Sequence, residues 1–134
     1  MADLEVFVVT PERALWSGPA ELVIARGTEG EVGILRGHAP MLIRLAVAPI
    51  RIRTGERDVR AVVDGGFLHV STEGDVTRVD VLADGAQLAE EVDVAAAERD
   101  RAAARERLEA DRDDEAARAA LARAEARLAL SEPG

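Results

Sequence analysis

Cysteine is absent from the 134-residue sequence, which excludes a disulfide framework, a thiolate zinc site and a cysteine nucleophile. Aromatic residues are scarce, because Phe7, Trp16 and Phe67 are the complete set. With a net charge of −9, the chain also lacks the basic stripe and the stacking side chains that nucleic-acid binding requires. It has neither an apolar run of about 20 residues nor a signal region. We therefore expect a soluble intracellular protein that binds no nucleic acid and does not insert into a membrane.

Glycine, proline and β-branched residues are almost missing from the second part of the chain. Residues 1–84 contain 13 of the 15 valines and all five isoleucines, whereas residues 85–134 contain 17 of the 26 alanines. Strand formers thus come first, and the best helix former follows them. The sequence predicts two structural units, a β domain over residues 1–86 and a helical unit over residues 87–134.

Short apolar runs separated by turn residues fill the first unit. They cover residues 4–9, 21–26, 31–35, 41–48, 50–53, 59–63, 67–70 and 76–82. Eight or nine strands with turns at this spacing predict an antiparallel β-sandwich or barrel.

The second unit has the pattern of two helices. Asp93 is the expected N-cap of a helix that ends near Ala110, and Asp113 or Asp114 is expected to cap a second helix that ends near Leu130. Because the turn between them is short, the helices must run antiparallel. Large apolar side chains are few and alanine buries little area, so we expect a hairpin that docks weakly and can move.

No recognisable catalytic site stands out among the residues. His69 alternates with Leu68 and Val70 and is interpreted as a sheet residue, while His38 lies in a Gly-His-Ala-Pro loop. A Ser-His-Asp triad stays open on residue types alone, although no serine lies in a G-x-S-x-G context. Two histidines without helical spacing make a poor metal site. We predict no catalytic residue and no metal ligand.

Three segments, in order, resemble one known family. They are residues 29–42 (EGEVGILRGHAPML), 63–70 (VDGGFLHV) and 79–86 (VDVLADGA). These segments are similar to the signature regions of the epsilon subunit of F-type ATP synthases, which is called delta in mitochondria. The main departure is Arg36, where the family usually carries proline.

The resemblance implies a sandwich of about ten antiparallel strands with a C-terminal antiparallel helical hairpin. It implies a non-catalytic rotor subunit in the central stalk of a proton-translocating ATP synthase. Such a subunit binds the gamma subunit and the c-ring and couples ring rotation to the catalytic head. Glu29, Glu31 and His38 match the family's loop that faces the ring and gamma. The implied location is peripheral, on the cytoplasmic face of the cell membrane.

The resemblance also implies that the helical arm can reach the alpha/beta catalytic head transiently and inhibit ATP hydrolysis. Relatives that bind ATP between the two helices carry two arginines on the first helix, and Ala96 and Ala103 stand at those positions here. Asp93, Arg123 and Arg127 match the rest of that motif. Because half of the cationic clamp is missing, we expect no resident cofactor and at most weak ATP binding.

Two alternative functions remain open at this point. One is a nucleotide-sensing regulatory module, which would require ATP binding by the isolated chain. The other is a free-standing small hydrolase that uses His38.

Overall fold

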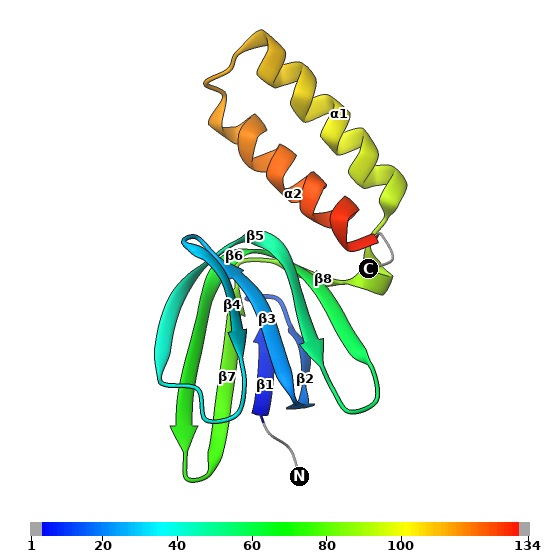
Figure 1. Cartoon of the computed structure of the whole chain (residues 1–134). Coiled ribbons are helices and arrows are strands. Elements are labelled where there is room, and N and C mark those ends of the chain that lie inside the picture. Colours follow the sequence, from blue (N-terminus) through cyan, green and yellow to red (C-terminus); the bar gives the residue numbers. More distant parts are fainter. Residues whose placement is uncertain (1–3, 132–134) are drawn as a thin grey trace.

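The computed structural model describes residues 4–131, which form a β-sandwich with a helical hairpin at one end (Figure 1). Its strands are β1 (Leu4–Val9), β2 (Ala14–Ala20), β3 (Leu22–Gly27), β4 (Gly30–Ile34), β5 (Met41–Arg53), β6 (Asp58–Glu73), β7 (Val76–Ala83) and β8 (Ala86–Leu88). Its helices are the 3-10 helix η1 (Ala89–Glu91), α1 (Val94–Ala110) and α2 (Glu115–Ser131). The predicted combination of a β-sandwich and a helical hairpin is confirmed.

The strands follow the order β2-β1-β7-β6-β5-β3-β4, and β8 pairs with the first part of β6. The pairing between β1 and β7 is parallel, whereas the other strand pairs are antiparallel. The described residues hold eight strands, so the expected number of about ten and the expectation of purely antiparallel pairing were wrong in detail. Strand β8 also carries the sheet to Leu88, two residues beyond the predicted boundary at residue 86.

Two long strands explain the lower number. The predicted runs 41–48 and 50–53 form the single strand β5. Pro49 lies between them, at an irregularity in the pairing of β5 with β3. Because regular pairing is already interrupted there, the missing N–H of proline does not end the strand. The runs 59–63 and 67–70 are joined within β6 by Gly65 and Gly66, whose φ angles of 92° and 117° favour glycine. Both strands arch across the top of the sandwich in Figure 1.

The sequence did not predict strand β2. It includes Gly18 and Pro19, which normally weaken a strand. Because β2 lies at the end of the sheet order and pairs with β1, it is an edge strand, and an edge tolerates a proline.

Alternation along the central strands decides which side chains enter the core. Leu68 and Val70 of β6 and Val79 and Val81 of β7 are fully buried. The residues between them point the other way, since successive side chains of a strand face opposite sides of the sheet. One face of these strands therefore packs the core, and the other is exposed.

The helices begin where the sequence predicted. The Asp93 side chain accepts a hydrogen bond from the Ala96 N–H at 3.0 Å, and the Asp114 side chain accepts one from the Ala117 N–H at 2.9 Å. These bonds satisfy helix-terminal donors that have no partner within the helix. The bond from Ala117, together with the nearby guanidinium of Arg107, lowers the pKa of Asp114.

The two helices pack through small side chains. The buried residues of α1 are Ala97 and Ala104, and the buried residues of α2 include Ala117 and Ala124. Helix α2 is the one that lies nearer the sandwich in Figure 1. Neither helix is long and apolar enough to cross a membrane, nor is any other helix in the described part of the chain.

The apolar contact between the hairpin and the sandwich is small. Its buried residues are Val62 of β6 and Ala126 and Leu130 of α2, with Val47 packed beside them. Small apolar areas contribute little stabilisation at about 25 cal/mol per Å². Polar contacts must therefore carry a substantial part of the docking.

Candidate functional site

Three neighbouring strands, β5, β6 and β7, expose apolar side chains on the face opposite the core. Leu42 of β5, Phe67 of β6 and Leu82 of β7 are 66%, 43% and 50% exposed. Leu82 lies opposite Phe67 and next to Val9 of β1 in register, and Phe67 lies opposite Arg44 of β5. We call this surface the outer face; a second row across it holds Phe7, Asp80, His69 and Leu42.

Two arginines cover aromatic rings of the outer face. The Arg44 guanidinium lies 5.5 Å from the centre of the Phe67 ring, and that of Arg78 lies 4.1 Å from the centre of the Phe7 ring. Arg78 also forms an ion pair of 3.0 Å with Asp80. Exposed aromatic residues with arginine at their side are typical of surfaces that bind another protein.

A second candidate site is the polar contact between α2 and the sandwich. The Arg127 guanidinium donates to both carboxylate oxygens of Asp64 at 3.0 Å and to the Gln87 side chain at 2.7 Å. Arg60 of β6 donates to the carbonyl of Leu130 near the end of α2. The side chains of Asp64 and Arg127 are each 19% exposed, so this ion pair is largely shielded from water.

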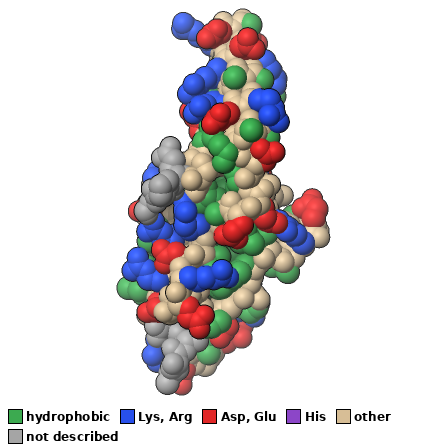
Figure 2. Space-filling model, turned by 90° about the vertical axis from the view of Figure 1, so that its right-hand side faces the viewer, with side chains coloured by type: hydrophobic (Ala, Val, Ile, Leu, Met, Phe, Trp, Pro, Cys, Tyr) green, Lys and Arg blue, Asp and Glu red, His purple; other side chains and the backbone are tan. Residues whose placement is uncertain are grey.

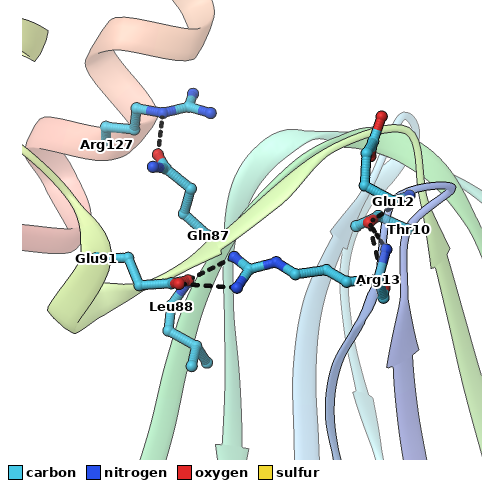
Figure 3. A network of polar contacts seen from close by, with 7 residues as sticks. All are labelled: Thr10, Glu12, Arg13, Gln87, Leu88, Glu91 and Arg127. Carbon is cyan, nitrogen blue, oxygen red and sulfur yellow. Dashed lines mark hydrogen bonds and ion pairs between the residues drawn. The ribbon is translucent and has the colours of Figure 1, made fainter.

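A separate ion pair ties the start of the hairpin to the sandwich. Arg13, in the β1–β2 connection, donates to both carboxylate oxygens of Glu91 at 2.9 and 2.7 Å (Figure 3). The Leu88 N–H donates to the same carboxylate at 2.8 Å. Arg13 and this N–H hold the pKa of Glu91 below its ordinary value.

Acid should weaken this contact, and the direction follows from the pKa of Glu91. A carboxyl group whose pKa is lower in the folded chain stabilises the fold at any pH above its ordinary pKa. That stabilisation is lost as the pH falls through the lowered pKa. We expect Glu91→Gln to lower Tm at pH 7 by about 1–4 °C and to narrow the Tm difference between neutral and acidic pH. Thermal unfolding over a pH series measures both. The control is Glu90→Gln, and an equal pH dependence in the two variants would contradict the prediction.

The residues predicted for the ring and gamma contact do not share one loop. Glu29 lies in the turn between β3 and β4, Glu31 is exposed on β4, and His38 is half-buried in the loop after β4. Figure 1 shows the β3–β4 turn at the end of the sandwich that carries the helices and the β4–β5 loop at the opposite end. The structure therefore brings Glu29 and Glu31 together and separates them from His38.

The loop of His38 is fixed by a buried threonine. The Gly37 N–H donates to the side chain of Thr77 in β7 at 2.8 Å, and Thr77 is 2% exposed. The His38 N–H donates to the Leu35 carbonyl at 3.1 Å. The loop thus has a defined position beside β7, while Leu35 remains 60% exposed.

The residues predicted for weak ATP binding are only partly brought together. Arg123 and Arg127 line a cleft of about 480 Å³ between the helices, which Ala103 and Arg107 also line. Asp93 does not line this cleft, and its side chain caps α1 instead. Two of the cations that line the cleft are already engaged, since Arg127 pairs with Asp64 and Arg107 pairs with Asp114 at 3.1 Å.

Sequence reasoning missed the polar contacts of the arm. Asp64 lies in one of the three family segments, but nothing local to it indicates a partner 63 positions away. The same holds for Arg13 and Glu91, which are 78 positions apart. Only the three-dimensional arrangement shows these pairs.

Comparison with known proteins supplies the family. A model of the ATP synthase Delta/Epsilon chain, beta-sandwich domain, matches residues 3–89, which is more than half of the chain. The chain belongs to the ATP synthase delta/epsilon family. The match spans β1 to β8, including the outer face and the strand that carries Asp64.

Individual members of the delta/epsilon family agree with this. The ATP synthase epsilon chain of Brevibacillus brevis is 47% identical over 110 residues, covering 81% of this chain and 77% of the relative. The ATP synthase epsilon chain of Mycolicibacterium smegmatis is 48% identical over 109 residues, covering 80% and 87%. A chain in the structure of the Euglena gracilis mitochondrial ATP synthase, OSCP/F1/c-ring, matches with a TM-score of 0.81 and 25% identity over 98% of this chain and 83% of that one.

Membership of the delta/epsilon family decides between two of the earlier interpretations. The chain is a non-catalytic subunit of an ATP synthase, and the alternative of a free-standing hydrolase using His38 is set aside. The structural match covers the hairpin as well as the sandwich, so the arm is part of the shared fold.

Proposed function

We propose that this chain is the rotor subunit that joins the gamma subunit to the c-ring of a proton-translocating ATP synthase and transmits ring rotation to the catalytic head. In this proposal residues 1–86 bind gamma and the ring, and residues 87–134 form a regulatory arm. The subunit would work peripherally, on the cytoplasmic face of the cell membrane.

The exposed outer face is the observation that carries the proposal. Three large apolar side chains, of Leu42, Phe67 and Leu82, gather on adjacent strands instead of being scattered singly. Contiguous apolar surface flanked by arginine is typical of a protein-binding surface. We assign this face to gamma.

Two separate surfaces suit a subunit with two partners. The loop of His38 leads into β5, the strand that carries Leu42 of the outer face, and we assign this loop to gamma as well. Glu29 and Glu31 lie at the other end of β4 and form an exposed acidic turn. We assign this turn to the ring.

The arm is proposed to leave the sandwich, reach the alpha/beta head and inhibit ATP hydrolysis. Its small apolar contact supports this, because a few buried side chains oppose undocking only weakly. On the side shown in Figure 2, basic and acidic side chains are interspersed over the arm and the sandwich. This surface can remain solvated in both the docked and the undocked state. ATP binding is expected to be weak at most, since Asp64 and Asp114 already occupy Arg127 and Arg107.

Phe67→Ala tests the proposed gamma contact. Because Phe67 is exposed, its loss should leave the sandwich stable while weakening binding of the purified gamma subunit by about tenfold to a hundredfold. Isothermal titration calorimetry measures the affinity. The matched control is Val94→Ala, which removes an exposed apolar side chain from α1 and should leave the affinity unchanged. Native affinity in both variants would remove the outer face from the proposed interface.

A further inference from the structure

We propose that Asp64 acts as an internal anion for Arg127 and thereby holds the arm on the sandwich without any bound ligand. The inference deepens the regulatory role proposed for the arm, and it rests on that role only for its effect on ATP hydrolysis. Its structural part concerns this chain alone.

The backbone that carries Asp64 is hydrogen-bonded within the sandwich. The Asp64 N–H donates to the Gly85 carbonyl at 2.8 Å, and one carboxylate oxygen lies 3.0 Å from the position that a side chain at Gly85 would take. A side chain at position 85 would therefore crowd the carboxylate. Because this backbone is fixed and the aspartate side chain is short, Asp64 loses little conformational freedom when Arg127 docks.

Nearly all hydrogen-bond donors of the Arg127 guanidinium are used within the chain. One terminal nitrogen donates to Asp64 and to the Arg123 carbonyl, the other donates to Asp64, and the third nitrogen donates to Gln87. A guanidinium has five N–H donors, so little capacity is left for an external anion. Asp64 thus holds α2 on the sandwich and also prevents Arg127 from binding phosphate-bearing ligands.

The Asp64–Arg127 pair is more deeply buried than the Arg13–Glu91 pair and therefore has the larger effect on docking of the arm. Asp64 and Arg127 are each 19% exposed, whereas Arg13 and Glu91 are 47% and 34% exposed. Removing one partner of a shielded pair leaves the other charge poorly solvated, which disfavours the docked state. The Arg13–Glu91 pair joins the sandwich to η1, so it does not hold α2 directly.

The proposal predicts that neutralising Asp64 releases the arm. Because the chain has no cysteine, Glu73→Cys in β6 and Asp113→Cys in the turn between the helices provide two specific positions for a donor and an acceptor dye. In this labelled chain, Asp64→Asn should shift the docking equilibrium toward the undocked state by about tenfold to a hundredfold. Energy transfer between the dyes measures this shift.

Asp58→Asn is the matched control, because it makes the same substitution on the same strand. Asp58 pairs with Arg51 and Arg53 at 3.6 and 3.7 Å, away from the arm, so energy transfer should stay native. Arg127→Gln should release the arm at least as strongly as Asp64→Asn, because it also removes the bond to Gln87, and adding Asp64→Asn to it should change little. Arg127→Gln also serves as the test if Asp64→Asn does not fold. Native energy transfer in Arg127→Gln and in a folded Asp64→Asn would overturn the proposal.

Hydrolysis assays on the assembled complex separate this inference from the proposed function. If Asp64→Asn releases the arm in the energy-transfer experiment and lowers ATP hydrolysis, both stand. If it releases the arm while hydrolysis remains native, Asp64 holds the arm as proposed, and the inhibitory role is lost.

Discussion

Gly66→Ala is expected to abolish the cooperative folding of the sandwich. The φ angle of Gly66 is +117°, and a Cβ there would lie 2.1 Å from the carbonyl oxygen of Leu82 and 2.8 Å from the Cα of Ala83. Both neighbours are backbone atoms of the paired strand β7, which cannot move aside without breaking the pairing. We expect the free energy of unfolding to fall by more than about 4 kcal/mol.

The matched control for this variant is Gly74→Ala. Gly74 also has a positive φ angle, +62°, but nothing lies within 4 Å of an added Cβ. The left-handed conformation alone costs about 1–2 kcal/mol. Urea denaturation followed by circular dichroism distinguishes the two cases, and similar losses in both variants would show that the contact with β7 is unimportant.

Leu68→Ala is expected to cost about 3–5 kcal/mol of the free energy of unfolding. Leu68 is fully buried between the layers, so its truncation loses transfer free energy and leaves a cavity. Leu82→Ala removes the same atoms from a side chain that is 50% exposed on the outer face, and we expect it to cost less than about 1 kcal/mol. Urea denaturation of the two variants measures the difference. Equal losses would contradict the assignment of the two faces.

Local signals carried most of what could be predicted of the fold. Asp93 and Asp114 cap their helices through hydrogen bonds to residues three positions away, which a sequence pattern can indicate. The alternation around Leu68 likewise marks a strand with one buried face. Both features depend on neighbours in the chain, and both were confirmed.

The features that could not be predicted depend on distant partners. Strand β2 exists because β1 lies beside it, although Gly18 and Pro19 argue against a strand. The separation of Glu29 from His38 follows from the course of β4, which motif matching does not convey. The pairing of Asp64 with Arg127 required the hairpin to be placed on the sandwich.

The parallel pairing of β1 with β7 has a consequence for the order in which the chain folds. Leu4 lies opposite Thr77, so the first strand obtains one of its two neighbours only after about 70 further residues have been synthesised. Closing so long a loop is slow, and non-local pairings of this kind lower folding rates. The helical hairpin closes through near neighbours and is free of this delay. During synthesis, β1 therefore has an unpaired edge until β7 has emerged from the ribosome. The growing chain is most prone to aggregation in that interval.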